Sequence, residues 1–280
     1  MKLTLKHFLN FSFWTELFFF ALSMLLAIGI ALNLLLALPV EQRITVSSGY
    51  SAWNFIIMFI IATAILLIIL KYFKRPWIIK GLFYLAIFEG LLIFSIAYFG
   101  APNFLLVLII ILIFWLLYKN VLIHDAIIIM STSAIAVIFG LNIYPSTAVI
   151  ILILLAVYDF WAVYKTKHMV RMFRGLAEAK VHLALIIPQT FFGLFQKVKN
   201  VSPTTEFMFL GTGDIVIPAI LVVSALKISI LSSFITGLGA ILGFILLYAI
   251  FVTQEKREPM PGLPPIILGT LFGFLISFLF

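Results

Sequence analysis

Two aspartates lie inside apolar stretches of the chain, where a charge is costly. Asp159 occurs in VYDFW, and Asp214 follows a Gly-Thr-Gly turn in FLGTGDIVIPAIL. If the two carboxyl groups face each other in a medium of low dielectric constant, they cannot both ionise and must share a proton. The ionised member can then take a proton from a water molecule that attacks a carbonyl, while the protonated member polarises that carbonyl or protonates the leaving nitrogen. Such a pair titrates as a unit, so neither aspartate is assigned as the acid or the base.

The composition indicates whether these aspartates lie in a soluble domain or among membrane helices. Of 280 residues, 65% are hydrophobic and 10% are charged. A soluble domain cannot cover that much apolar surface, whereas repeated runs of about 20 apolar residues are typical of transmembrane helices. The sequence therefore predicts an all-α, polytopic protein of the cell membrane with nine transmembrane helices. The predicted spans are 14–38, 53–70, 78–99, 102–118, 123–141, 145–164, 209–227, 232–251 and 262–280.

The basic residues indicate the orientation of these helices. If the N-terminus is cytoplasmic, only Arg43 and Lys227 of the 18 Lys and Arg fall outside, and the other 16 fall inside. This bias predicts a cytoplasmic N-terminus and an external C-terminus. The net charge of +8 then reflects topology. Because no continuous basic face exists, the expected surroundings are the lipid bilayer and nucleic acid is not expected as a partner.

The topology brings the two aspartates to one level in the membrane. The sixth predicted helix ends inside near Lys165, which places Asp159 about six residues, or roughly 9 Å, from its cytoplasmic end. The seventh begins inside, and Asp214 lies about five residues, or roughly 7 to 8 Å, along it. We therefore expect a carboxylate pair on consecutive helices. Gly211 and Gly213 would let the backbone approach a neighbouring helix or a substrate closely.

One long connection divides the chain. Residues 1–164 carry six predicted helices, residues 165–208 form a cytoplasmic loop, and residues 209–280 carry three helices. The loop contains VHLALIIPQTFFGLFQKVK, which is apolar, interrupted by Pro188 and too short between charges to span a bilayer comfortably. We expect an amphipathic segment that lies on the membrane, and a role as a gate or a substrate-contacting segment is compatible with it.

Other residues carry weaker signals. Glu16, near the cytoplasmic start of the first helix, is interpreted as structural, because a helix N-terminus favours an anion. Glu89 lies mid-span and stays open between a neutral packing role and a functional one. His124 and Asp125 are interpreted as residues of the membrane interface. The small-residue spacing of GLGAILG and GTLFG predicts close packing of the last two helices.

Several kinds of site are not expected. The chain has no Cys, which excludes disulfides, thiolate metal sites and cysteine nucleophiles. The four His are isolated from one another, so no metal site is predicted. No nucleotide-binding motif occurs, and no cofactor is expected.

A third motif accompanies the two motifs that contain the aspartates. PMPGLPPI opens the last predicted helix at the same cytoplasmic level, and its proline-rich backbone could pair with an unwound peptide. In chain order the motifs are Y-D at Tyr158-Asp159, G-x-G-D ending at Asp214, and P-G-L-P at 261–264. Together they resemble the Y-D, G-x-G-D and P-A-L motifs of the presenilin and signal peptide peptidase family of intramembrane aspartyl proteases, as in an archaeal presenilin-like homologue. The resemblance extends to the whole nine-helix plan, including the long loop.

The resemblance implies roles for individual residues. Asp159 and Asp214 would be the catalytic pair, with Tyr158 as a neighbour. The other motif residues would shape the site or contact the substrate backbone: Gly211, Thr212, Gly213, Pro261, Gly262, Leu263 and Pro264. Gly262 stands where the family has Ala, a small change in volume that we expect to be tolerated. The orientation inferred from the basic residues is similar to that of presenilins, whereas signal peptide peptidases invert the bundle.

The expected activity is hydrolysis of peptide bonds within transmembrane segments of membrane proteins, by the two aspartates and water. The alternative is an ion channel or a proton- or cation-coupled transporter that uses the buried carboxylates. An inverted repeat or paired broken helices would favour that alternative, and the sequence shows neither. Prepilin-type peptidases also use G-x-G-D, but they have fewer helices and a differently placed aspartate. The expected partners are transmembrane-helix substrates; a homo-oligomer stays open, and no obligatory subunit is evident.

Overall fold

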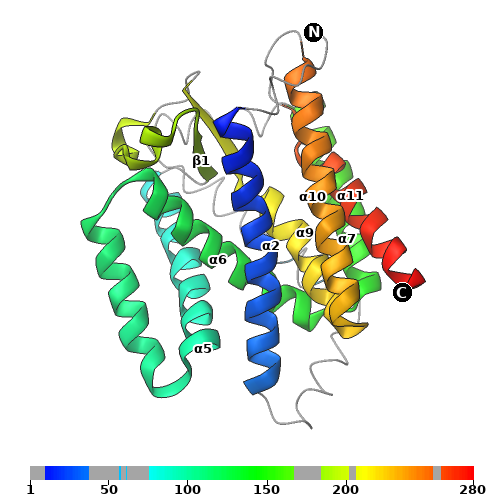
Figure 1. Ribbon diagram of the computed structural model, residues 1–280, viewed down its shortest axis with the longest axis horizontal. Helices are drawn as coiled ribbons and strands as arrows, with labels where there is room; N and C mark the ends of the chain where they lie inside the picture. Colours follow the sequence, from blue (N-terminus) through cyan, green and yellow to red (C-terminus); the bar gives the residue numbers. More distant parts are fainter. Residues whose placement is uncertain are drawn as a thin grey trace.

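The computed structural model describes residues 10–37, 57, 61, 76–166, 184–201, 206–254 and 260–280. Within these ranges the chain is mostly helical, and two short strands lie at one end of the helix bundle (Figure 1). The helices are α2 (Phe11–Ala37), α5 (Pro76–Leu117), α6 (Val121–Asn142), α7 (Pro145–Trp161), α9 (Thr212–Ser224), α10 (Ile230–Thr253) and α11 (Leu263–Ile276). The strands are β1 (Ala184–Pro188) and β2 (Phe207–Gly211).

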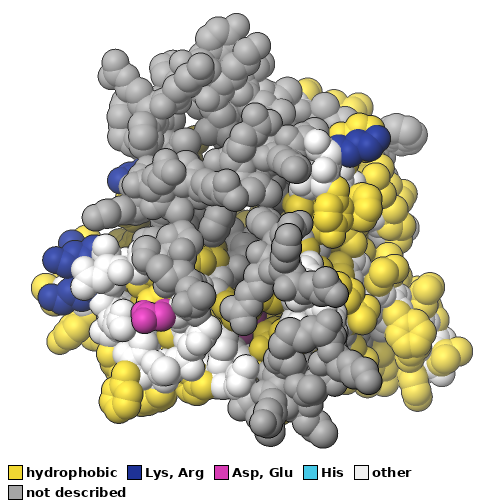
Figure 2. Space-filling model, turned by 90° about the horizontal axis from the view of Figure 1, so that it is seen from above, with side chains coloured by type: hydrophobic (Ala, Val, Ile, Leu, Met, Phe, Trp, Pro, Cys, Tyr) yellow, Lys and Arg dark blue, Asp and Glu magenta, His cyan; other side chains and the backbone are white. Residues whose placement is uncertain are grey.

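Five of the described helices are long and apolar enough to cross a membrane. They cover Phe11–Ala37, Lys80–Leu117, Val121–Asn142, Pro145–Lys165 and Ile230–Thr253, and the apolar helix Leu263–Leu279 is shorter. Many large hydrophobic side chains are exposed on their outer surfaces, as along the flank of the molecule in Figure 2. The nine predicted spans are matched in part, since span 53–70 lies outside the described residues except for Ile57 and Ile61.

The predicted spans 78–99 and 102–118 form the two arms of α5. The helix is broken at Gly100, whose φ of 57° lies in the left-handed region that favours glycine, and at Ala101, which is extended. The chain reverses direction there (Figure 1). Tyr84 of the first arm contacts Trp115 of the second, with 5.5 Å between the ring centroids, so the two arms lie side by side.

The strands form an antiparallel pair, with Leu185 opposite Leu210 and Ile186 opposite Phe209. All five residues of β1 are buried, so this part of the long loop is not the amphipathic surface segment that the sequence predicts. Its apolar side chains are covered on both faces, which is why the run reads as continuously hydrophobic. Strand β2 is followed at once by α9, so the first residues of the predicted span 209–227 pair as a strand instead of forming a helix.

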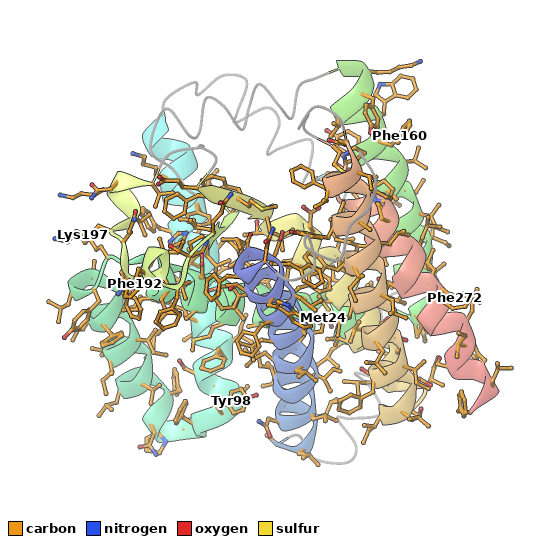
Figure 3. The ribbon with its side chains drawn as sticks, turned by 45° about the horizontal axis from the view of Figure 1, so that its top comes forward. Met24, Tyr98, Phe160, Phe192, Lys197 and Phe272 are labelled. Atoms are coloured by element: carbon orange, nitrogen blue, oxygen red, sulfur yellow. The ribbon has the colours of Figure 1, made fainter. Side chains whose placement is uncertain are left out.

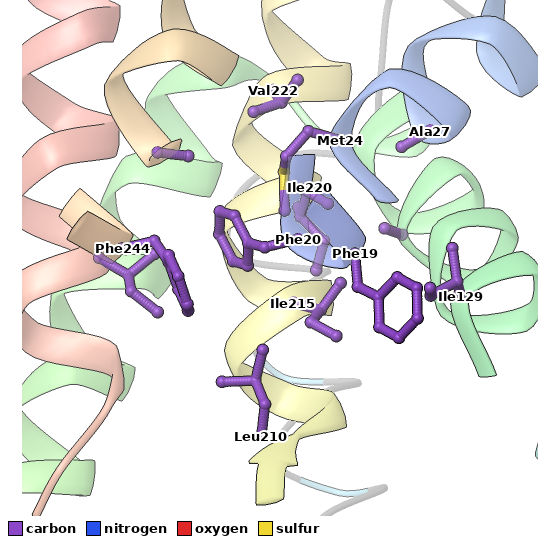
Figure 4. Close-up of a cluster of buried hydrophobic side chains, with 14 of the residues drawn as sticks. Phe19, Phe20, Met24, Ala27, Ile129, Leu210, Ile215, Ile220, Val222 and Phe244 are labelled. Atoms are coloured by element: carbon purple, nitrogen blue, oxygen red, sulfur yellow. The ribbon is translucent and has the colours of Figure 1, made fainter. Parts of the chain in front are cut away.

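Helix α2 packs against α6, α9 and α10 and supplies the centre of the core. Phe20 stacks on Phe244 of α10, with ring centroids 4.9 Å apart. Phe19, Met24 and Ile215 belong to the same buried cluster (Figure 4). Van der Waals packing of such side chains favours helix association in this core. The cluster fixes α2 against the first turns of α9.

Helices α10 and α11 approach closely through glycine. A Cβ added to Gly269 would lie 2.5 Å from the Cα of Gly243, and one added to Gly273 would lie 2.8 Å from the Cα of Gly239. Real side chains do not come so close to backbone, so the crossing requires residues without a Cβ. The close packing predicted from the two small-residue motifs is confirmed, and it fixes the position of α11.

Replacing Gly269 with Val should push these helices apart. The added side chain overlaps backbone atoms of α10, and we expect a loss of about 1 to 3 kcal/mol in the free energy of unfolding. Thermal unfolding in detergent micelles measures the loss. Gly81→Val is the matched control, because a Cβ there meets no atom within 4 Å. Equal unfolding midpoints for the two variants would contradict this description of the crossing.

Candidate active site

Asp159 points inward from the last turn of α7. Its side chain is 3% exposed, whereas the adjacent Tyr158 and Phe160 are 61% and 56% exposed. Figure 3 shows Phe160 on the outer side of α7. The Asp159 Oδ2 accepts the backbone N–H of Leu263 at 3.1 Å, and the carboxylate also accepts the N–H of Gly262. Asp159 therefore joins the end of α7 to the start of α11, while the structure does not bring Tyr158 into this contact.

Asp214 lies in the first turn of α9. Its carboxylate accepts the backbone N–H of Gly211, the last residue of β2. A Cβ on Gly211 would lie 3.0 Å from the Asp214 Oδ2, so glycine makes room for the carboxylate to turn back toward the strand. A helix N-terminus also favours a negative charge. The G-x-G-D motif thus combines a strand end and a helix start with an acid held between them.

The two carboxylates meet at one short segment, Gly262-Leu263. The Leu263 N–H donates to Asp159, and a Cβ on Gly262 would lie 2.9 Å from the Asp214 Oδ2. Because adjacent residues make these two contacts, the nearest oxygens of the two carboxylates are at most about 10 Å apart. The charge of Asp159 also acts on Asp214. The structure therefore brings Asp159 and Asp214 together in one site.

The other motif residues lie around this pair. Thr212 and Gly213 are the first two residues of α9. Pro261 is buried ahead of the last helix, and Leu263 and Pro264 are its first residues. The proline-rich segment that the sequence predicts as extended therefore ends where α11 begins.

Gly262 lies directly against Asp214. Its φ of −82° and ψ of −36° suit any L-residue, so the backbone conformation does not require glycine. A Cβ, however, would lie 2.9 to 3.1 Å from all three atoms of the Asp214 carboxylate group. Alanine therefore requires a shift of the Asp214 carboxylate, and the tolerance expected from residue volume stays a prediction that the Gly262→Ala variant tests.

Sequence reasoning missed the role of Asp125. The residue is fully buried on α6, and its Oδ1 accepts the backbone N–H of Ile186 at 2.9 Å. That N–H lies on the edge of β1 that faces away from β2, so Asp125 occupies the outer edge of the strand pair. The interpretation of Asp125 as an interfacial residue is corrected by this burial. Its partner lies 61 residues away, and no local pattern marks it.

The interpretation of Glu16 as merely structural overlooked its neighbour. Its side chain is 6% exposed, and the charge of Asp214 acts on it. A signal was present in the sequence, because Glu16 lies about five residues, or roughly 8 Å, from the start of its helix. That is the depth inferred for both aspartates.

This arrangement suits acid–base chemistry at a carbonyl. Two carboxyl groups in a largely apolar bundle can hold one proton between them and so supply an acid and a base together. Within the described ranges, no group of three or more His, Asp or Glu is placed to hold a metal ion. The class of protein defined by such a pair between apolar helices is an aspartyl protease that acts within a membrane.

Comparison with known proteins identifies the family. A family model described as "Signal-peptide peptidase, presenilin aspartyl protease" matches residues 17–280, so the chain belongs to this family. Two similar solved structures are both described as a presenilin family intramembrane aspartate protease, in the C222 and P2 space groups. A search of curated proteins finds no match.

Both structures share the fold over nearly the whole chain. The first is 21% identical with a TM-score of 0.63, and the alignment covers 95% of this chain and 98% of that one. The second is 24% identical with a TM-score of 0.59, and the alignment covers 93% and 96%. The chain is a mostly helical, multi-pass membrane protein with a presenilin-like fold, and it is an intramembrane aspartyl protease. Proteolysis is therefore its activity.

Gly262→Ala tests how closely the start of α11 approaches the aspartates. The added methyl group displaces Asp214, and we expect kcat for peptide cleavage to fall about 10- to 100-fold at an unchanged unfolding temperature. Cleavage of a reconstituted single-span substrate measures the change. Gly237→Ala is the control, because its Cβ would make an ordinary contact, 3.7 Å from Val222 Cγ1. A wild-type kcat in Gly262→Ala would contradict the close approach.

Asp125→Ala should loosen the strand pair. The Ile186 N–H loses its acceptor, and a buried unsatisfied donor costs about 1 to 3 kcal/mol in unfolding free energy. Asp125→Asn keeps an acceptor oxygen and should unfold near the wild-type temperature. Hydrogen exchange at the Ile186 amide reports the effect directly. If both variants are destabilised equally, the hydrogen bond is not the reason for the aspartate.

Proposed function

We propose that Asp159 and Asp214 are the catalytic dyad and that the enzyme cleaves peptide bonds within transmembrane segments of other membrane proteins. The observation that carries the proposal is the convergence of both carboxylates on Gly262-Leu263. Membership of the family supports it, because hydrolysis of an amide by carboxyl groups needs one acid and one base at the same carbonyl.

Hydrolysis begins with one carboxyl group ionised and the other protonated. The ionised group takes a proton from water, the water oxygen bonds to the carbonyl carbon, and the protonated group gives its proton to the carbonyl oxygen. The resulting diol collapses when the C–N bond breaks and the nitrogen receives a proton from the dyad. The diol returns a proton, so the pair ends as it began and can act again.

The substrate must present an unwound carbonyl to this pair, because a helix occupies its own backbone groups. The proposed contacts come from the strand end and helix start at 211–213 and from the segment 261–264. Leu263 already donates its N–H to Asp159, and Pro261 and Pro264 have none. Because the carbonyl groups from Gly262 onward accept hydrogen bonds within α11, the segment would offer the carbonyl oxygen of Pro261 to an N–H group of an extended substrate.

We also propose the nine-span plan with a cytoplasmic N-terminus and an external C-terminus, divided at the loop 165–208. Figure 2 views the end of the bundle that carries the strands, and Lys and Arg side chains lie around its rim. This is the end at which α2 begins (Figure 1). It corresponds to the side that receives 16 of the 18 basic residues in the predicted topology. The proposed dyad would then lie near the cytoplasmic face.

Single replacements of the aspartates test the proposed dyad. Asp159→Asn and Asp214→Asn preserve shape but remove the shared proton, and we expect each to lower cleavage by at least about a thousandfold. The assay is mass spectrometry of products from a single-span substrate in liposomes. Glu89→Gln is the matched control, because it makes the same chemical change at an exposed acid on α5. Activity retained in either aspartate variant would refute the dyad.

A further inference from the structure

A turn in the long loop exposes several aromatic side chains. Phe191–Phe195 forms a short 3-10 helix after β1, here called the aromatic turn. Phe192 is 82% exposed, and more than half of the Phe191 and Phe195 side chains is exposed as well. Five residues cannot span a bilayer, so this exposure is not that of a transmembrane helix facing lipid. Exposed apolar side chains that cluster on a surface mark a contact with another molecule or with a membrane.

The aromatic turn is held in place by the rest of the fold. Gly193 is buried, and a Cβ added to it would overlap the Cβ of Pro188, the last residue of β1. The Gly193 N–H donates to the Thr190 carbonyl at 3.0 Å. The ring of Phe191 contacts Phe11 at the start of α2, with ring centroids 6.1 Å apart. The exposed rings therefore project from a turn that is packed onto β1 and α2.

Hydrogen bonds set the level of this turn relative to the membrane helices. The Val121 N–H, at the start of α6, donates to the Gln196 carbonyl at 3.0 Å, and the Val198 N–H donates to the Lys119 carbonyl at 3.0 Å. Lys119 lies two residues beyond Leu117, which is 72% exposed and ends a helix long enough to cross a membrane. The aromatic turn therefore lies at the level where the apolar surface of α5 ends, which is the level of the lipid headgroups.

Basic side chains flank the aromatic turn. Lys119, Lys197 and Lys199 are all exposed, and Lys197 forms a β-bridge with Asn120. Figure 3 shows Phe192 and Lys197 at the same edge of the molecule. Apolar rings beside lysines are typical of segments that lie on a bilayer, where the rings enter the acyl boundary and the ammonium groups attract anionic lipids. This charge favours an anionic bilayer surface over an apolar protein partner.

We propose that residues 191–199 form an anchor that binds anionic lipids on the side of the membrane where α2 begins. The three phenylalanines of the aromatic turn enter the acyl boundary, and the three flanking lysines bind lipid phosphate groups. The backbone stays among the headgroups, because a short turn cannot satisfy all its N–H and C=O groups in hydrocarbon. Since the turn packs on the end of β1, the anchor fixes at the membrane the strand pair that ends beside Asp214.

A fluorescent reporter tests the insertion. The chain has no Cys, so Phe192→Cys carries a single label. In liposomes of phosphatidylcholine and phosphatidylglycerol, this label should be quenched by lipids with a nitroxide roughly 5 to 10 Å below the headgroups. The matched control is the same label at Glu206→Cys, an exposed acid just before β2, where it should stay in water and respond to iodide.

Two results of this experiment would overturn the anchor. One is lipid quenching at position 192 no greater than at position 206. The other is protection of the label at 192 from both nitroxide lipids and iodide, which would show that a protein partner or a second copy of the chain covers the turn.

Lysine variants test the choice of lipid. Lys197→Gln and Lys199→Gln should each weaken phosphatidylglycerol binding in detergent about fivefold, as measured by native mass spectrometry, and leave phosphatidylcholine binding unchanged. Lys165→Gln is the control, because Lys165 is exposed beyond α7, on the side of the molecule that Phe160 marks in Figure 3. No loss in the first two variants, or an equal loss in all three, would refute the lipid site. Neither measurement involves cleavage, so failure of the proposed dyad would leave both results unchanged.

Discussion

The hydrogen bond from the Leu263 N–H to the Asp159 carboxylate is the contact on which the site depends. It joins the end of α7 to the start of α11, and the residue before Leu263 lies directly against Asp214. Helix α11 can reach this position because glycines allow it to pack closely on α10. Asp214 is placed independently, by the N–H of Gly211 at the end of β2. If α11 moved away, Asp159 would lose its donors and the two acids would lose the segment between them.

The acids lie where a helical protein has backbone N–H groups that lack a partner within a helix. The first N–H groups of a helix have no partner within that helix, and Leu263 is the first residue of α11. Asp214 similarly lies in the first turn of α9, where the helix dipole favours a negative charge. Carboxylates buried in an apolar bundle must be compensated, and element ends supply that compensation. The site therefore lies where a helix end, two helix starts and a strand end meet.

The sequence predicts the parts of this arrangement that depend on depth. The basic residues set the topology, and the topology places Asp159 and Asp214 at one level. The same argument places Glu16 at that level as well. Tertiary pairing was not predictable in this way: β1 is apolar on both faces, and Asp125 meets Ile186 only because the strand folds back onto α6. The crowding at Gly262 depends on an approach of a few tenths of an ångström, which residue volume alone does not reveal.

The central claim is that Asp159 and Asp214 act together on one carbonyl beside Gly262. The most direct measurement is a structure of the protein bound to a peptide isostere that carries a hydroxyl group in place of the scissile carbonyl, since such groups mimic the tetrahedral intermediate. The shared dyad predicts the hydroxyl oxygen within hydrogen-bonding reach, roughly 2.6 to 3.2 Å, of both carboxylates. A hydroxyl bound to only one aspartate, or to neither, would contradict it.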